Sequence, residues 1–166
     1  DVLLVAAAGN SNLNNDVYAG YPANLNLPNV ISVAATDRFD NKASFSNYGP
    51  TTVDLGAPGV DIVSTYTLNA AYATLSGTSM ATPHVVGAAA LAAAAAPTAT
   101  GQQIKNAIFS TVDPVQALAG ITVTGGRLNV FKAVQSLVSG GELRGTKWED
   151  TDGDGVPDAE DSNPLT

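Results

Sequence analysis

Apolar stretches separated by polar and glycine-rich segments divide most of the chain into predicted strands and helices. Residues 2–8 and 30–35 are short and almost continuously apolar, which predicts two buried strands. Four shorter stretches between Pro- and Gly-containing turns predict further strands, at residues 43–46, 53–55, 62–64 and 73–75.

Longer patterns in the second half of the chain predict three helices. Residues 79–96 are apolar on every side from Val85 onward, which is typical of a buried helix. Residues 100–112 and 130–138 each have one apolar face and predict amphipathic helices, the second with Asn129 as its N-cap. Buried strands mixed with helices predict an α/β domain.

Composition and charge narrow the possible functions. The chain has no cysteine, which excludes a disulfide framework and a cysteine-ligated zinc site. Because no apolar run approaches the ~18 residues of a membrane helix, we expect no membrane span. Residues 1–141 hold seven acids against five bases, whereas residues 142–166 hold eight acids against two bases. An acidic tail on a nearly neutral body disfavours nucleic acid and indicates a cation as partner.

Two segments carry candidate catalytic residues. In GTSMATPH at residues 77–84, Ser79 lies at the first turn of a predicted helix, where the positive end of the helix dipole stabilises negative charge. The alternative is that Ser79 only caps this helix. In AAAGN at residues 6–10, Asn10 follows a strand and a glycine, so its amide can face the carboxyl edge of the sheet. Taken alone, that segment is explained more simply by a turn asparagine.

Both segments, in this order, resemble the subtilisin-like serine proteases (subtilases). Further segments similar to the family follow in the family's order: GYPA, NVISVAA, ASFSNYG, APGV and GRLNV, which begin at residues 20, 29, 43, 57 and 126. The resemblance covers about residues 1–138. It implies a three-layer α/β sandwich with a mainly parallel sheet that is incomplete at its N-terminal side.

The resemblance also implies an activity and roles for individual residues. The chain would be part of a serine endopeptidase that hydrolyses peptide bonds of a polypeptide substrate through an acyl-enzyme on Ser79. Asn10 and the backbone N–H of Ser79 would form the oxyanion hole. A cis peptide bond is implied between Tyr21 and Pro22. The pocket for the substrate side chain before the cleaved bond would be lined by Ala7, Ala8, Gly9 and Gly20.

The residues that activate the serine in this family have no counterpart in the sequence. Neither the Asp-Ser/Thr-Gly motif nor the His-Gly-Thr-His motif occurs. The sole histidine, His84, lies five positions after Ser79, which places it ~140° around the helix and ~7.5 Å along it. It is therefore too far away to act as the base. We expect the C-terminal half of an enzyme that needs its missing N-terminal half as partner, is inactive alone and exposes a free sheet edge.

The acidic segment at residues 150–166, which follows a linker at 139–149, has the spacing of a calcium-binding loop. Positions 1, 3, 5, 7, 9 and 12 of an EF-hand-like loop are filled by Asp150, Asp152, Asp154, the Val156 carbonyl, Asp158 and Asp161. The segment resembles a thrombospondin type 3 repeat, as found on secreted proteins. We therefore expect calcium, no organic cofactor, and a secreted or cell-surface location. The alternative is a disordered acidic tail.

Two other classes of function stay open. A non-catalytic scaffold derived from a subtilase would bind peptides without cleaving them. A calcium-stiffened surface or adhesion module would use the body only as a carrier. The sequence upstream of residue 1 would discriminate between these functions. The presence there of both the aspartate and the histidine motif would support the enzyme, and their absence would support the scaffold.

Overall fold

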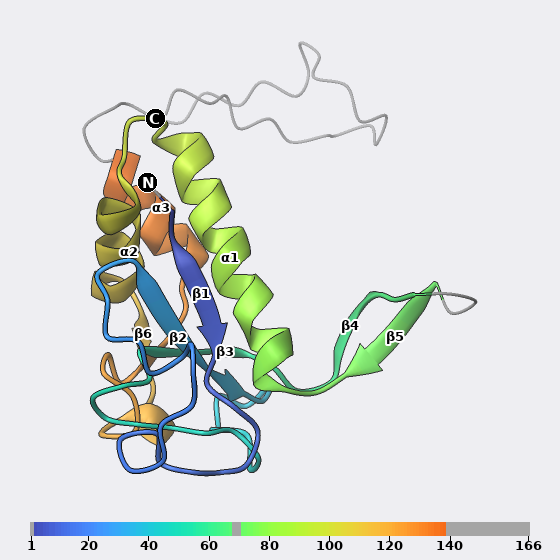
Figure 1. Ribbon diagram of the computed structural model, residues 1–166. Coiled ribbons are helices and arrows are strands. Elements are labelled where there is room, and N and C mark those ends of the chain that lie inside the picture. The colour runs from blue at the N-terminus through green and yellow to red at the C-terminus, as the bar shows by residue number, and fades with distance from the viewer. Residues whose placement is uncertain (1, 68–70, 139–166) are drawn as a thin grey trace.

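The computed structural model describes residues 2–67 and 71–138, and the structural statements below concern these residues. Their strands are β1 (Leu4–Ala7), β2 (Val30–Thr36), β3 (Leu55–Pro58), β4 (Ile62–Thr65), β5 (Tyr72–Leu75), β6 (Asp113–Pro114) and β7 (Gly126–Arg127). Their helices are α1 (Thr78–Ala95), α2 (Gly101–Ser110), α3 (Val130–Val138) and a short 3₁₀ helix (Gln116–Leu118). Five strands form one sheet in the order β1-β2-β3-β7-β6, and β4 and β5 form a separate hairpin (Figure 1).

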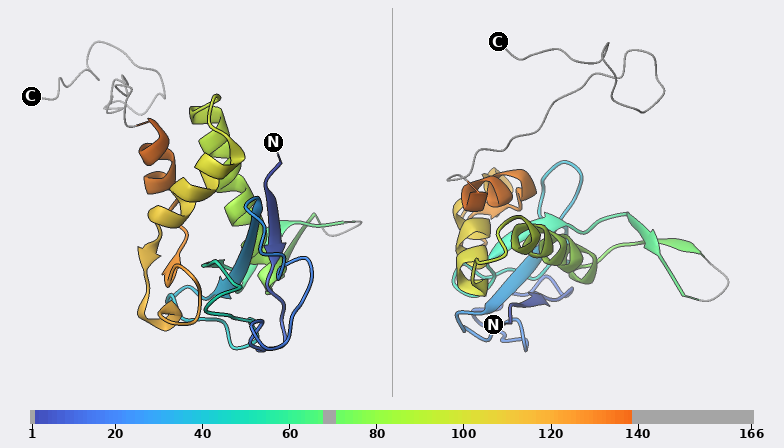
Figure 2. Two further views of the ribbon diagram at one scale, coloured as in Figure 1. Left: turned by 60° about the vertical axis from the view of Figure 1, so that its left-hand side comes forward. Right: turned by 90° about the horizontal axis from the view of Figure 1, so that it is seen from above.

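The sheet is mainly parallel, because β1, β2, β3 and β7 run in one direction and only β6 runs against β7. Strand β2 is buried along its whole length, as its apolar sequence predicts. Ile31, Val33 and Ala35 alternate along β2 and belong to the core that all three α-helices share. Figure 2 shows the helices on one side of the strands. The predicted α/β fold with a mainly parallel sheet is confirmed, and within the described ranges the helices form a single layer.

Helix α1 is buried on one side only, so the prediction that it is buried all round is wrong. Its buried residues recur at helical spacing and face the sheet: Thr78, Ala81, Val85, Ala88 and Ala92. On the other side, Val86 is 47% and Leu91 56% exposed. The reason is that the described chain supplies one sheet face and two helices against α1, which together cover only part of its apolar circumference.

Among the described residues, strand β1 ends the sheet and pairs only with β2, which leaves its other edge open. Leu4 is 40% exposed, and Val2, just before the strand, is 74% exposed. The free sheet edge expected from the sequence is therefore confirmed. The segments in strands β4 and β5 were also predicted, but they pair with each other and project from the body as a hairpin (Figure 1).

Residues 43–46 form a turn and not the predicted strand. The backbone N–H of Ser46 donates to the carbonyl of Ala43 at 2.9 Å, which closes the turn. The Ser46 hydroxyl accepts from the Ala35 N–H at 2.9 Å, so a side chain takes the place of a neighbouring strand. No helix of the described residues is long and apolar enough to cross a membrane.

Candidate active site

The end of β1 and the start of α1 meet through direct hydrogen bonds between Asn10 and Thr78. The side-chain Oδ1 of Asn10 accepts from the Thr78 backbone N–H at 2.9 Å and from the Thr78 hydroxyl at 2.8 Å. The same hydroxyl accepts from the Gly9 N–H at 3.2 Å. Because Ser79 directly follows Thr78 and is exposed, the predicted proximity of Asn10 and Ser79 is confirmed.

Two N–H donors, from Asn10 and Ser79, lie near Gly77. A Cβ atom on Gly77 would lie 3.5 Å from Asn10 Nδ2 and 3.7 Å from the backbone nitrogen of Ser79. Neither donor has a hydrogen-bond acceptor among the described residues, because Thr78 binds only the oxygen of the Asn10 amide. Unpaired N–H donors that lie near each other are the kind of group that stabilises a developing oxyanion. The arrangement therefore suits the role predicted for Asn10 and Ser79.

Ser79 lies in the first turn of α1, where the helix dipole is unopposed because that turn holds no acidic residue. His84 lies one turn further on, and its Nδ1 atom is 3.0 Å from the carbonyl oxygen of Met80. This contact agrees with the prediction that His84 is not the base for Ser79. The sequence contains no other histidine. The described residues thus bring together a serine and two unpaired N–H donors, and the one histidine among them binds the backbone of its own helix.

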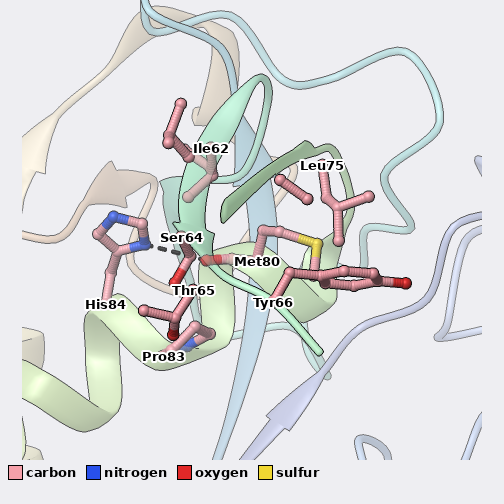
Figure 3. Close-up of a pocket in the computed structure, with 10 residues that line it drawn as sticks. Ile62, Ser64, Thr65, Tyr66, Leu75, Met80, Pro83 and His84 are labelled. Carbon is pink, nitrogen blue, oxygen red and sulfur yellow. Dashed lines mark hydrogen bonds between the residues drawn. The ribbon is translucent and has the colours of Figure 1, made fainter. Parts of the chain in front are cut away.

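A cavity of about 410 Å³ lies beside the start of α1, between this helix and the β4–β5 hairpin (Figure 3). Met80, the residue after Ser79, reaches into it, whereas Ser79 and Asn10 do not line it. The cavity is mainly apolar and is lined by Ile62, Val63, Ser64, Thr65, Tyr66, Ala73, Leu75, Met80, Pro83 and His84. A mainly apolar cavity therefore lies next to the segment that carries the serine.

The residues predicted to line the substrate pocket lie in two segments that a chain of hydrogen bonds connects. Asn15 Nδ2 donates to the carbonyl of Ala8 at 2.9 Å, and Asn24 Nδ2 donates to the carbonyl of Asn15 at 2.8 Å. The Asn24 side-chain oxygen accepts from the Gly20 N–H at 2.8 Å. Ala8, which directly follows β1, is thereby linked to Gly20 in the following loop.

The other predicted pocket residues belong to the same two segments. Ala7 is the half-buried last residue of β1, and Gly9 has a φ of 115°, a conformation that favours glycine. No heavy atom outside the adjoining residues lies within 4 Å of the point where a Cβ atom on Gly20 would sit, so this segment borders open space. The Tyr21–Pro22 bond is cis, as the family resemblance implied.

The far end of this loop is held by helix α2. The ammonium of Lys105 donates to the carbonyl of Val30 at 2.5 Å. Burial raises the pKa of the nearby Asp54 carboxyl, while a 2.7 Å hydrogen bond from the Ser32 N–H and the charge of Lys105 act against this rise. The loop that begins at Gly20 is thus fastened at both ends.

Sequence reasoning missed three residues that shape this site, namely Thr78, Asn15 and Asn47. Residues 11–16 are mostly polar, a composition typical of a surface loop, yet Asn15 is 1% exposed. No spacing in the sequence marks a loop asparagine as buried. The predicted calcium ligands Asp150, Asp152, Asp154, Val156, Asp158 and Asp161 lie outside the described residues. Within residues 2–67 and 71–138, no group of three metal-ligating side chains occurs.

Comparison with known proteins gives consistent matches over most of the chain. The model of the subtilase family matches residues 1–153. The chain is 47% identical over 133 residues to thermitase of Thermoactinomyces vulgaris, covering 80% of this chain and 44% of thermitase. It is 48% identical over 110 residues to subtilisin BL of Lederbergia lenta, covering 66% of this chain and 38% of that protein.

A solved structure titled as the prenylagaramide maturation protease PagA is similar in fold, with a TM-score of 0.67 and 32% identity. The match covers 82% of this chain and 50% of that structure. The chain thus spans less than half the length of the two curated relatives named above.

Proposed function

The chain belongs to the subtilase family, and we propose that it supplies the nucleophile and the oxyanion hole of a serine endopeptidase. The observation that carries this proposal is the pairing of Asn10 with Thr78, which leaves two free N–H donors beside Ser79. The substrate class is a polypeptide, as expected for a peptidase family.

In the proposed reaction, Ser79 Oγ attacks the carbonyl carbon of the substrate peptide bond, and its proton passes to a base. The carbonyl oxygen becomes an oxyanion that accepts hydrogen bonds from Asn10 Nδ2 and the Ser79 N–H. Collapse of this intermediate breaks the C–N bond, and the protonated base delivers the proton to the leaving amine. Water then hydrolyses the acyl-enzyme on Ser79 by the reverse sequence of proton transfers.

The base and its orienting carboxylate are proposed to come from a partner segment that corresponds to the N-terminal half of the family's catalytic domain. Three features of the described residues support such a partner. Strand β1 has a free edge, α1 exposes Val86 and Leu91, and an apolar cavity adjoins Met80 next to the serine. By this proposal the chain alone is inactive, because a serine hydroxyl without a base is a weak nucleophile.

The proposal also includes calcium binding by the acidic segment and a secreted or cell-surface location. The support for calcium is the spacing of Asp150, Asp152, Asp154, Asp158 and Asp161, with the Val156 carbonyl between them. The location rests on the resemblance of this segment to repeats of secreted proteins. Detection of the chain only inside the cells that make it would contradict the proposed location.

The test compares the 166-residue chain with an extended chain, in which a segment carrying the family's aspartate and histidine motifs precedes residue 1. This segment is taken from the protein's own gene or from thermitase. We expect peptide hydrolysis only by the extended chain. Replacement Ser79→Ala should lower its kcat by about 10⁶-fold, a magnitude that was measured on subtilisin, a relative of this chain. Ser44→Ala is the matched control: Ser44 is exposed, and its replacement should leave kcat unchanged.

Two outcomes would overturn the proposal. Strong activity of the 166-residue chain that Ser79→Ala abolishes would reveal a base within this chain. An extended chain that folds but shows no Ser79-dependent hydrolysis would favour the peptide-binding scaffold. Isothermal titration of that inactive form with peptides would then measure binding without cleavage.

A further inference from the structure

Asn47, in the loop between β2 and β3, binds the backbone on both sides of Asn10. Its backbone N–H donates to the carbonyl of Gly9 at 2.9 Å. Its side-chain Oδ1 accepts from the Ser11 N–H at 2.9 Å and from the Leu13 N–H at 3.0 Å. We propose that Asn47 is a positioning residue, which fixes the turn that presents the Asn10 amide to the oxyanion. This inference rests on the proposed function and deepens it.

The amide of Asn47 is itself held in one orientation by a second buried asparagine. Asn47 Nδ2 donates to Asn15 Oδ1 at 2.9 Å, and Asn15 Nδ2 donates to the carbonyl of Ala8 at 2.9 Å. A flipped Asn47 amide would turn its NH₂ group toward two backbone N–H donors, which is unfavourable. Asn47 is 8% and Asn15 1% exposed, so water is poorly placed to replace these bonds. The pair therefore clamps residues 8, 9, 11 and 13.

Close packing at Gly9 makes this clamp specific. A Cβ atom on Gly9 would lie 2.5 Å from Asn47 Nδ2, and the φ of Gly9 is 115°. Only glycine combines this backbone conformation with such a close approach. Asn47 consequently packs directly under the turn, one residue before Asn10.

The contacts divide the positioning of Asn10 between two residues. Thr78 fixes the side chain by binding Oδ1, and Asn47 fixes the backbone on either side of the Cα atom. Since donors in an oxyanion hole act mainly in the transition state, a displaced Asn10 should lower kcat and leave KM nearly unchanged. A residue needed only for stability would instead lower the folded fraction and leave kcat per folded molecule unchanged.

The kinetic test uses the extended chain defined above and a double-mutant cycle. Asn47→Ala should lower kcat about 10- to 100-fold per folded molecule, less than the ~10²–10³-fold for loss of the donor itself, a range measured on subtilisin. In an Asn10→Ala background, the same change should alter kcat less than about threefold, because the group it positions is gone. Asn41→Ala is the matched control, because Asn41 lies in the same loop and, among the described residues, its exposed side chain binds only Asp37.

The result that overturns the inference is an equal fold-loss of kcat with and without the Asn10 side chain. Asn47→Ser keeps a polar side chain in the same space if Asn47→Ala does not fold, and it should show the same loss confined to kcat. A loss of activity that merely follows the loss of folded protein, measured by circular dichroism, would also contradict the inference.

A measurement without catalysis separates failure of the inference from failure of the proposed function. In NMR spectra of the full chain, Asn47→Ser should remove the hydrogen-exchange protection of the Ser11 and Leu13 amides. It should also shift the Asn10 side-chain NH₂ resonances, whereas Asn41→Ala should change neither. Unchanged Asn10 resonances in Asn47→Ser would refute the positioning role even if the extended chain proved inactive.

Discussion

Gly59 lies where the end of β3 meets the start of α1, and an added methyl group would have no space. A Cβ atom there would lie 2.7 Å from Ala35 Cβ, 2.8 Å from the carbonyl oxygen of Gly77 and 3.2 Å from Ala81 Cβ. Carbon atoms in ordinary contact are ~3.5–4.0 Å apart, so the neighbours would have to move by up to about 1 Å. None of them is the end of a flexible side chain, so Gly59→Ala must displace backbone.

The expected cost follows from two opposing terms. Overpacking of this kind destabilises the folded state by ~1–3 kcal/mol. Alanine also lowers the conformational entropy of the unfolded chain, which stabilises the folded state by ~0.4–1 kcal/mol. We therefore expect Gly59→Ala to lower the free energy of unfolding by about 1–2 kcal/mol. The displaced Gly77 also adjoins the Asn10 and Ser79 donors, so the variant should lower the kcat of the extended chain as well.

The assay is urea denaturation of the full chain, with Gly87→Ala as the matched control. Gly87 lies within α1, and no heavy atom approaches within 4 Å of the position of its added Cβ. Because alanine is favoured over glycine inside a helix, this variant should gain ~0.8–1 kcal/mol. Replacing glycine by alanine is thus expected to lower the free energy of unfolding at position 59 and to raise it at position 87. A Gly59→Ala chain as stable as the parent, or two shifts of equal sign, would refute the packing argument.

Two further predictions concern the start of α1 and the acidic segment. Thr78→Val removes the hydroxyl that binds Asn10 and Gly9. Steady-state kinetics of the extended chain should then show a roughly tenfold lower kcat. Thr78→Ser keeps the hydroxyl and should retain most of the activity. Equal kcat values for the valine and serine variants would count against this role. Calorimetric titration of the full chain should give a calcium Kd of ~10⁻⁴–10⁻³ M, weakened by Asp152→Asn. Absence of heat at millimolar calcium would leave only a solvated acidic tail.

Elements with long regular patterns could be predicted from the sequence, and elements made by tertiary contacts could not. Residues 30–35 and 130–138 were predicted with bounds within one residue of β2 and α3, because each pattern extends over six residues or more. Strands β6 and β7 have two residues each and carry no period. They form only where distant segments meet, since Arg127 pairs with both Gly56 of β3 and Asp113 of β6.

The same distinction applies to the candidate site. Asn10 and Ser79 were found because each lies in a contiguous motif that resembles one family. Asn15 and Asn47 lie in loops, where polar residues predict exposure, yet they bind each other across 32 positions of sequence. They are buried because one loop packs over another, and this contact cannot be predicted from the local composition of either loop.

The open edge of β1 and the uncovered side of α1 have a consequence for the colloidal behaviour of the chain. Such surfaces favour association between copies, by strand pairing and by apolar contact. Repulsion has to oppose this, and of the net charge of −8, residues 1–141 carry only −2 and residues 142–166 carry −6. The acidic segment therefore supplies most of the electrostatic repulsion between copies of the chain. Added salt shortens the Debye length to ~8 Å at physiological ionic strength, so we expect light scattering by concentrated solutions to rise with salt.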